Sequence, residues 1–283
     1  MKYTHEFCER EYNVRASIPD HPAILSRWTL QAAATRRLHA CLLDLAYGEL
    51  PDERLDFFPT RLEPSPLFVF IHGGYWRSLD KSDFSWIAPA WVRQGVSVAL
   101  LNYGLAPQTR IEDMVLQVLQ ALAWLYRRAQ RYGIDPGRVV VCGHSAGAHL
   151  AALSMAAQFP TLAADLPLAL VKGVLAISGL YDLEPLMHAP FVNVDLKLDA
   201  ARACKLSPLQ YPAAAGARLI TAVGGAESGE FARQSRLIGN HWRSSLVREV
   251  PMPQRNHFDI VDDLADADSP LFKAGLELFQ GAA

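Results

Sequence analysis

The sequence lacks the features of several classes of protein. Its 283 residues include 27 Lys and Arg against 29 Asp and Glu, a formal net charge of -2 with histidine neutral. That balance offers no basic excess for binding nucleic acid or an anionic membrane. No apolar run approaches the roughly 20 residues that cross a bilayer, and the first residues contain none of signal-peptide length. We therefore expect a cytoplasmic protein with neither a nucleic-acid nor a membrane partner.

Cysteine is also scarce, and no two of the four cysteines form a C-x-x-C pair. Scattered cysteines of this kind favour reduced thiols over a disulfide framework or a zinc site. His144 and His149 do not have the H-E-x-x-H spacing of a zinc protease, and no third ligand accompanies them. No basic cluster suggests a phosphate or coenzyme A partner. We expect no metal and no cofactor.

Apolar segments of strand and helix length alternate along the chain. The predicted strands are 54–59, 67–72, 96–101, 139–141, 171–178, 219–223 and 246–250, and the predicted helices are 23–45, 84–94, 110–131, 146–157, 227–240 and 270–280. This alternation predicts a single α/β domain, residues 1–283, with a doubly wound, mostly parallel sheet and helices on both faces. Residues 1–46 are expected to form a helical N-terminal arm that is irregular before residue 22. The proline-rich segment 182–212 is expected to be a cap-like insertion.

A short glycine-serine motif lies between a predicted strand and a predicted helix. Residues 143–147 read Gly-His-Ser-Ala-Gly, a match to G-x-S-x-G, and the helix that follows is rich in small residues. A serine on a sharp strand-to-helix turn needs small neighbours, because strand and helix come close together there. The helix N-terminus also favours developing negative charge. Ser145 is therefore the predicted nucleophile.

An attacking serine needs a base, and the base needs a carboxylate that orients it. In a sheet of this kind the chain order is serine, acid, histidine. His257 follows the last strand and is the predicted base, whereas His144 and His149 are expected to point elsewhere. Glu227 follows the strand at 219–223 and is the favoured acid, with Asp182 as the main alternative.

The loop after the strand at 67–72 reads Gly73-Gly74-Tyr75-Trp76. Two glycines allow a loop to expose main-chain N–H groups, and an acyl-transfer site needs such donors for the tetrahedral oxyanion. We expect an oxyanion hole formed by this loop, through Gly73, Gly74 and Tyr75, together with the N–H of Ala146.

Aromatic residues could line a substrate pocket near the serine. The candidates are Tyr75 and Trp76 first, then Tyr181, Phe191 and Trp28, with Trp76 and Tyr181 expected to bind substrate, although each is also of a type common in a core. Such a wall would suit an aryl or small acyl substrate.

Taken together, these motifs resemble the kynurenine formamidase (arylformamidase) branch of the α/β-hydrolase superfamily, near the hormone-sensitive-lipase-like esterases. The resemblance rests on residues 72–76 and 143–147, on 178–186 with 206–208, on 225–231 and on 256–259. It implies the α/β-hydrolase fold with a small insertion after its sixth strand. It also implies Ser145 as nucleophile, Glu227 as acid and His257 as base. The chain departs from the family at the acid, which is usually Asp.

Three functions follow as hypotheses. The first is a serine hydrolase that cleaves a small acyl amide or ester through an acyl-enzyme, arylformamidase-like, with N-formylkynurenine as the candidate substrate. The second is a general carboxylesterase or carbamate hydrolase acting on small aryl or acyl esters. The third is a non-catalytic binding protein with this fold. A small molecule is the expected partner, and a homodimer is left open.

Overall fold

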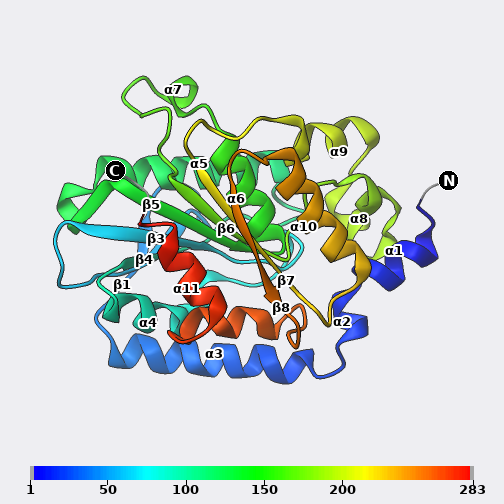
Figure 1. The fold of residues 1–283 in the computed structure, drawn as a ribbon, viewed down its shortest axis with the longest axis horizontal. Helices are drawn as coiled ribbons and strands as arrows, with labels where there is room; N and C mark the ends of the chain where they lie inside the picture. Colours follow the sequence, from blue (N-terminus) through cyan, green and yellow to red (C-terminus); the bar gives the residue numbers. More distant parts are fainter. Residues whose placement is uncertain (1–2, 281–283) are drawn as a thin grey trace.

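The computed structural model describes residues 3–280, which fold around one eight-stranded sheet (Figure 1). The strand order is β1-β2-β4-β3-β5-β6-β7-β8. Strands β1 and β2 are antiparallel to their neighbours, and the others run parallel. The strands are β1 (Leu42–Ala46), β2 (Arg54–Phe58), β3 (Ser65–Ile71), β4 (Ser97–Leu101), β5 (Ile134–His144), β6 (Gly173–Ile177), β7 (Arg218–Gly224) and β8 (Leu246–Met252). The sheet is the doubly wound, mostly parallel one that the alternating sequence predicts, and the fold is the α/β-hydrolase fold that the resemblance implies.

Helices cover both faces of the sheet. One face is covered by α3 (His21–Leu38), α4 (Ala88–Arg93) and α11 (Pro270–Glu277), and the other by α5 (Ile111–Arg127), α6 (Ala146–Ala156) and α10 (Gly229–His241) (Figure 1). The central strand β3 is buried along its whole length, which explains its continuous apolar sequence. Each face of the sheet therefore has its own hydrophobic core.

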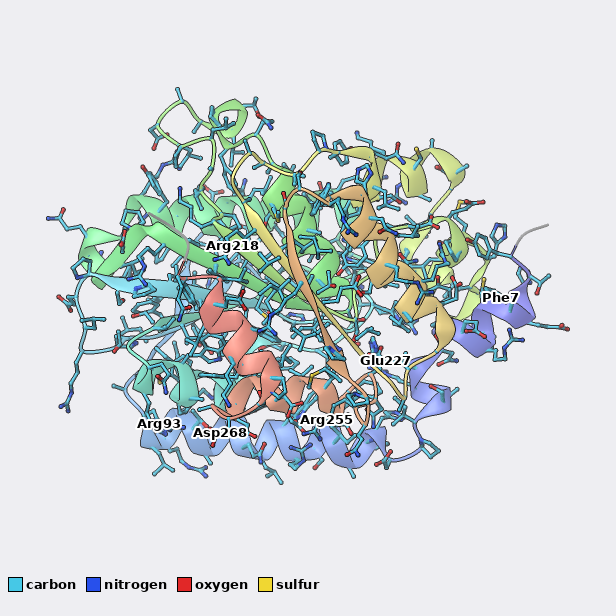
Figure 2. The ribbon with its side chains drawn as sticks, in the orientation of Figure 1. Phe7, Arg93, Arg218, Glu227, Arg255 and Asp268 are labelled. Carbon is cyan, nitrogen blue, oxygen red and sulfur yellow. The ribbon has the colours of Figure 1, made fainter. Side chains whose placement is uncertain are left out.

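The parallel strands bring their carboxyl ends to one edge of the sheet. Strand β7 runs from Arg218 toward Glu227, and Figure 2 shows these two residues near its opposite ends. Ser145 follows β5 directly, and His257 follows β8 through a short loop. Ligands of open parallel sheets bind at this edge, so the fold places the candidate residues where a site is expected.

The N-terminal region differs from the expectation for residues 1–46. Residues before 22 are not irregular, because they contain α1 (His5–Tyr12) and α2 (Val14–Ser17). The helix expected to reach residue 45 ends at Leu38, and Leu42–Ala46 is strand β1. The buried Lys81 ammonium lies 2.7 Å from carboxylate oxygens of both Asp44 and Asp56, which ties β1 to β2. This long-range ion cluster overrides the local helical spacing.

The segment 182–212 folds into short helices after β6. They are η4 (Glu184–His188), α8 (Pro190–Leu196), α9 (Ala200–Leu206) and η5 (Pro208–Gln210). In Figure 1, α8 lies next to α1 on the side of the molecule where β7 and β8 end. All four cysteines carry free thiols. Within residues 3–280, no helix is both long enough and apolar enough to cross a membrane.

The turn between β5 and α6 leaves no room for a side chain at Gly147. A Cβ added there would lie 2.0 Å from the carbonyl oxygen of Ile71 on β3. We therefore predict that Gly147→Ala lowers the free energy of unfolding by about 1–3 kcal/mol or more, because overpacking usually costs that much. Urea unfolding measures this, with Gly229→Ala as the control, since a Cβ at Gly229 would meet only one atom, at 4.0 Å. Equal stability of the two variants would contradict the tight approach.

Candidate active site

Ser145 sits at the sharp turn between β5 and α6. Its backbone angles, φ 56° and ψ -119°, are rare for a residue with a side chain. A Cβ at Gly143 would lie 2.2 Å from the carbonyl oxygen of Gly147, so the turn requires glycine there. The Ser145 N–H donates to the carbonyl of Ile177 on β6 at 2.8 Å, which fixes the turn to the sheet. The strain is thus held by surrounding backbone.

His257 lies between Ser145 and a carboxylate. Its Nε2 is 3.1 Å from the Ser145 Oγ, and its Nδ1 is 2.6 Å from Oε2 of Glu227. The carboxylate accepts the Nδ1 proton, which leaves Nε2 free to accept from the serine hydroxyl. The side chains of His257 and Glu227 are only 3% and 1% exposed. This arrangement can transfer a proton from the serine to the imidazole.

Glu227 is held by its second oxygen. Its Oε1 accepts from the N–H of Gly224 at 2.6 Å and from the hydroxyl of Ser178 at 2.5 Å. A glutamate is one methylene longer than the aspartate usual in the family. These two hydrogen bonds fix its carboxylate so that Oε2 faces His257. The sequence pattern does not single out Ser178, whose only signal is its position directly after β6.

The alternative acid faces another partner. The Asp182 carboxylate lies 3.1 Å from the Arg233 guanidinium. Glu230, one helical turn beyond Glu227, also pairs with Arg233, at 2.9 Å. Neither carboxylate is within hydrogen-bond distance of His257, so of these three carboxylates the structure brings only that of Glu227 to the imidazole.

His144 contradicts the expectation that it points away from the site. Its Nε2 lies 2.7 Å from the carbonyl oxygen of His257, so Nε2 carries the proton and Nδ1 does not. Burial, together with the nearby His257, holds the pKa of His144 well below its usual value, which keeps the imidazole neutral. His144 therefore fastens the loop that carries His257 to the turn that carries Ser145.

The loop after β3 presents main-chain donors beside Ser145. The carbonyl of Gly74 accepts from the Arg77 N–H at 3.1 Å and from the Ser78 hydroxyl at 3.0 Å. Because N–H and C=O point oppositely across a trans peptide, the N–H of Tyr75 faces away from those two donors. Among the described residues, the N–H groups of Gly74, Tyr75 and Ala146 have no hydrogen-bond acceptor. They remain available to a ligand.

Gly73 contributes through its lack of a side chain. A Cβ there would lie 2.9 Å from the carbonyl oxygen of His144 and 3.0 Å from the Ser145 Cβ. The loop can approach the serine turn only because this position is glycine.

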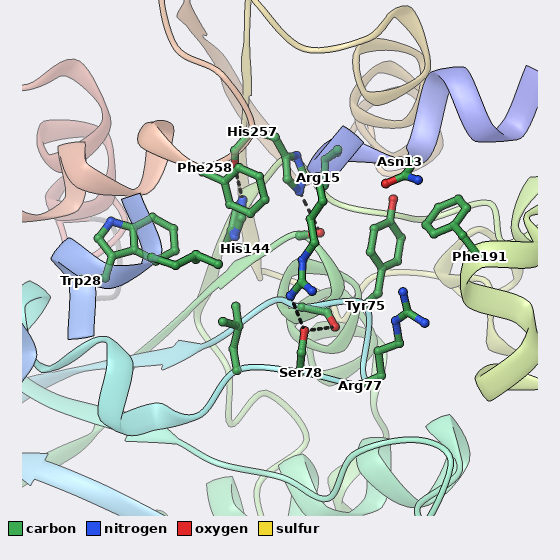
Figure 3. Close-up of a pocket in the computed structure, with 15 residues that line it drawn as sticks. Asn13, Arg15, Trp28, Tyr75, Arg77, Ser78, His144, Phe191, His257 and Phe258 are labelled. Atoms are coloured by element: carbon green, nitrogen blue, oxygen red, sulfur yellow. Dashed lines mark hydrogen bonds between the residues drawn. The ribbon is translucent and has the colours of Figure 1, made fainter. Parts of the chain in front are cut away.

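A cavity opens over Ser145 and is lined by fifteen residues, drawn in Figure 3. Its aromatic residues are Trp28, Tyr75, Phe191 and Phe258. Tyr75 and Phe191 meet edge to face, with ring centroids 5.6 Å apart. The cavity wall is therefore largely apolar, as a site for an aryl group would be.

Trp76 and Tyr181, expected as substrate-binding residues, do not line this cavity. Both side chains are almost completely buried in the core. The Trp76 ring packs perpendicular to the ring of His149 on α6, with centroids 5.0 Å apart. Trp76 follows Tyr75 in the same tight loop and points to the other side, which sequence alone could not decide.

The N-terminal segment supplies part of the cavity wall, through Asn13, Val14 and Arg15. The hydroxyl of Tyr75 donates to the carbonyl of Tyr12 at 2.5 Å, and the buried Tyr12 hydroxyl donates to Glu230 at 2.6 Å. These residues could not be predicted to line the site, because nothing in the local sequence pattern links them to Ser145.

The fold and the relatives of the chain define a serine hydrolase of the α/β-hydrolase superfamily. Residues 56–189 match the BD-FAE family. The chain is 31% identical to the kynurenine formamidase of Salmo salar, with 96% of this chain and 94% of the relative covered. It is also 31% identical to the kynurenine formamidase of Danio rerio, over 86% of this chain and 83% of the relative. The chain belongs to the kynurenine formamidase family.

Solved structures agree with the fold. A crystal structure of a candidate thioesterase from Silicibacter sp. has a TM-score of 0.82 and 33% identity, over 95% of this chain and 97% of that one. The carboxylesterase EstE1 from a metagenomic library has a TM-score of 0.71 at 18% identity, over 93% and 96% of the two chains, and supports the fold alone.

The buried His149 next to the site makes stability depend on pH. Its Nε2 lies 2.8 Å from the carbonyl oxygen of Leu206, and burial lowers its pKa from 6.5 to about 4. Between these values the unfolded chain binds more protons, so the free energy of unfolding falls as the pH drops from 6.5 toward 4 and levels off below.

We predict that His149→Gln makes this loss smaller, by up to about 3 kcal/mol. Urea unfolding of the wild type and the variant at pH 7 and at pH 4.5 provides the comparison. His5→Gln is the control, because His5 is exposed. The same loss in His149→Gln as in the wild type would exclude His149 as a source of the effect.

Proposed function

We propose that Ser145, His257 and Glu227 form the catalytic triad of a hydrolase that cleaves a small aryl amide through an acyl-enzyme. The observation that carries the proposal is the position of His257, 3.1 Å from the Ser145 Oγ and 2.6 Å from Glu227. A base in hydrogen-bond contact with both a nucleophile and an orienting carboxylate is the geometry that acyl transfer requires.

The reaction proceeds in two halves. His257 takes the proton of the Ser145 hydroxyl as its oxygen attacks the carbonyl carbon, and then gives that proton to the leaving nitrogen or oxygen. In the second half a water molecule attacks the acyl-enzyme, and His257 again takes and returns the proton. Glu227 keeps its hydrogen bond to Nδ1 and stabilises the imidazolium that forms in each half.

We propose that the N–H groups of Gly74, Tyr75 and Ala146 bind the tetrahedral oxyanion. Their support is that no described residue accepts a hydrogen bond from them and that Ala146 begins α6, whose N-terminus favours negative charge. Gly73 makes this hole accessible, since a side chain there would collide with the serine turn.

The proposed substrate class is the aryl formamides. The candidate within it is N-formylkynurenine, which the name of the family suggests. Two observations support this choice: the family relatives named as kynurenine formamidases, and the aromatic wall of the cavity over Ser145. The alternatives are a general carboxylesterase or a carbamate hydrolase, and a protein that binds small molecules without turnover.

A substrate panel decides between these functions. We expect wild-type protein to hydrolyse N-formylkynurenine and Ser145→Ala to lose about 10⁶-fold in kcat with its fold retained, the loss typical of a removed serine nucleophile. The panel also holds a p-nitrophenyl ester, an aryl carbamate and an aryl thioester, and circular dichroism checks the fold. Fast ester cleavage with negligible formamide cleavage would favour the carboxylesterase, and turnover that survives in Ser145→Ala would refute the nucleophile.

The acid is tested by a pair of variants. Glu227→Gln is expected to lower kcat by about 10³- to 10⁴-fold, because the amide cannot hold His257 in the tautomer that accepts the serine proton. Asp182→Asn is the matched control and is expected to cost far less, since Asp182 pairs with Arg233. The reverse ranking, measured as kcat on the same substrate, would assign the role to Asp182.

A further inference from the structure

The cavity over Ser145 carries positive charge without an acidic counterpart in its wall. Of the fifteen described residues that line it, two are arginines and none is an aspartate or a glutamate. The Arg77 guanidinium is compensated from outside the wall, because it lies 2.7 Å from the Asp195 carboxylate. Arg15 has no carboxylate within ion-pair distance among residues 3–280.

Arg15 is held across the cavity by the loop that carries the main-chain donors. Its Nη2 donates to the Ser78 hydroxyl at 3.0 Å, and that hydroxyl donates to the carbonyl of Gly74 at 3.0 Å. Figure 3 shows the side chain extending from α2 toward Ser78, between Phe258 and Tyr75. A guanidinium has five N–H donors, and one bond to Ser78 leaves others for a ligand.

The backbone under Arg15 is also anchored. Tyr12 is fully buried, its hydroxyl donates to Glu230, and its carbonyl accepts from the Tyr75 hydroxyl. The Asn13 side chain then accepts from the N–H of Ala16 and caps α2. Arg15 thus lies three residues after the fixed Tyr12, across the break at Asn13 between α1 and α2, and its guanidinium is held at the cavity by the hydrogen bond to Ser78.

We propose that Arg15 binds a carboxylate on the leaving group of the substrate and so makes the enzyme selective for anionic aryl amides. A guanidinium binds a carboxylate through two parallel hydrogen bonds, which fixes orientation as well as charge. The aromatic wall contacts the aryl ring, and Arg15 at the edge of that wall binds the charged substituent. The inference rests on the proposed function in one respect. A formyl group has no substituent, so the substrate carboxylate must be part of the amine that leaves.

Two probes that differ only in charge test this. They are 3-(2-formamidophenyl)propanoate and 3-(2-formamidophenyl)propanamide. We expect wild-type kcat/KM to favour the carboxylate by roughly tenfold, the scale of a charge-assisted hydrogen bond near solvent. Arg15→Gln brings the ratio close to one, and Arg15→Lys, which keeps the charge but loses the planar fork, gives an intermediate ratio.

Arg10→Gln is the matched control on the same segment. Arg10 pairs with Glu11, its side chain is 67% exposed, and it does not line the cavity. Its variant is expected to keep the wild-type ratio. An unchanged ratio in Arg15→Gln, or a ratio near one in the wild type, would overturn the inference while leaving the proposed hydrolysis intact.

A binding measurement separates this inference from the proposed function. Calorimetry on Ser145→Ala protein gives the Kd of 3-phenylpropanoate and of 3-phenylpropanamide without turnover. We expect roughly tenfold tighter binding of the carboxylate, and loss of that preference when Arg15→Gln is added. If neither formanilide is hydrolysed by the wild type but this preference is present, the proposed function fails and the Arg15 site stands. Equal binding of the two probes overturns the site.

Discussion

The close approach of three backbone segments at residues 143 and 147 is the constraint on which the site depends. Strand β3, strand β5 and the start of α6 pass so near each other that a Cβ at Gly147 would lie 2.0 Å from a β3 carbonyl. Overpacking at such a point costs stability, so the sequence has glycine at both positions. The result is a serine with strained angles whose hydroxyl faces His257, while the N–H of Ala146 at the helix start remains free.

Much of the fold and part of the site could be predicted from local sequence. Buried parallel strands are continuous apolar runs, and turns after them carry glycine and polar residues, so the order of strands, helices and candidate residues follows from the pattern. The chemistry of the serine motif also limits its partners to an acid and a histidine later in the chain. For these reasons, Ser145, Glu227 and His257 could be predicted from the sequence to belong to one site.

The remainder depends on contacts between distant segments. Strand β1 pairs with β2, and the buried Lys81 contacts Asp44 and Asp56 from 37 and 25 residues away, so the local spacing near residue 42 does not indicate the strand. Trp76 and Tyr181 are aromatic in suitable positions, but their direction is set by the packing of the loops that carry them. His144 was missed for a similar reason, since its partner is a backbone carbonyl 113 residues away.

Because the cavity wall includes residues 13–15, the parts of the site are synthesised by the ribosome at widely separated times. The Tyr12 hydroxyl finds its partner, Glu230, only after 218 further residues have been made, and the turn that carries Ser145 is made between the two. His257 emerges later still. A growing chain therefore carries Ser145 without His257 while the 112 residues from 146 to 257 are being made, and the cavity wall at residues 13–15 gains its anchor at Glu230 within that interval.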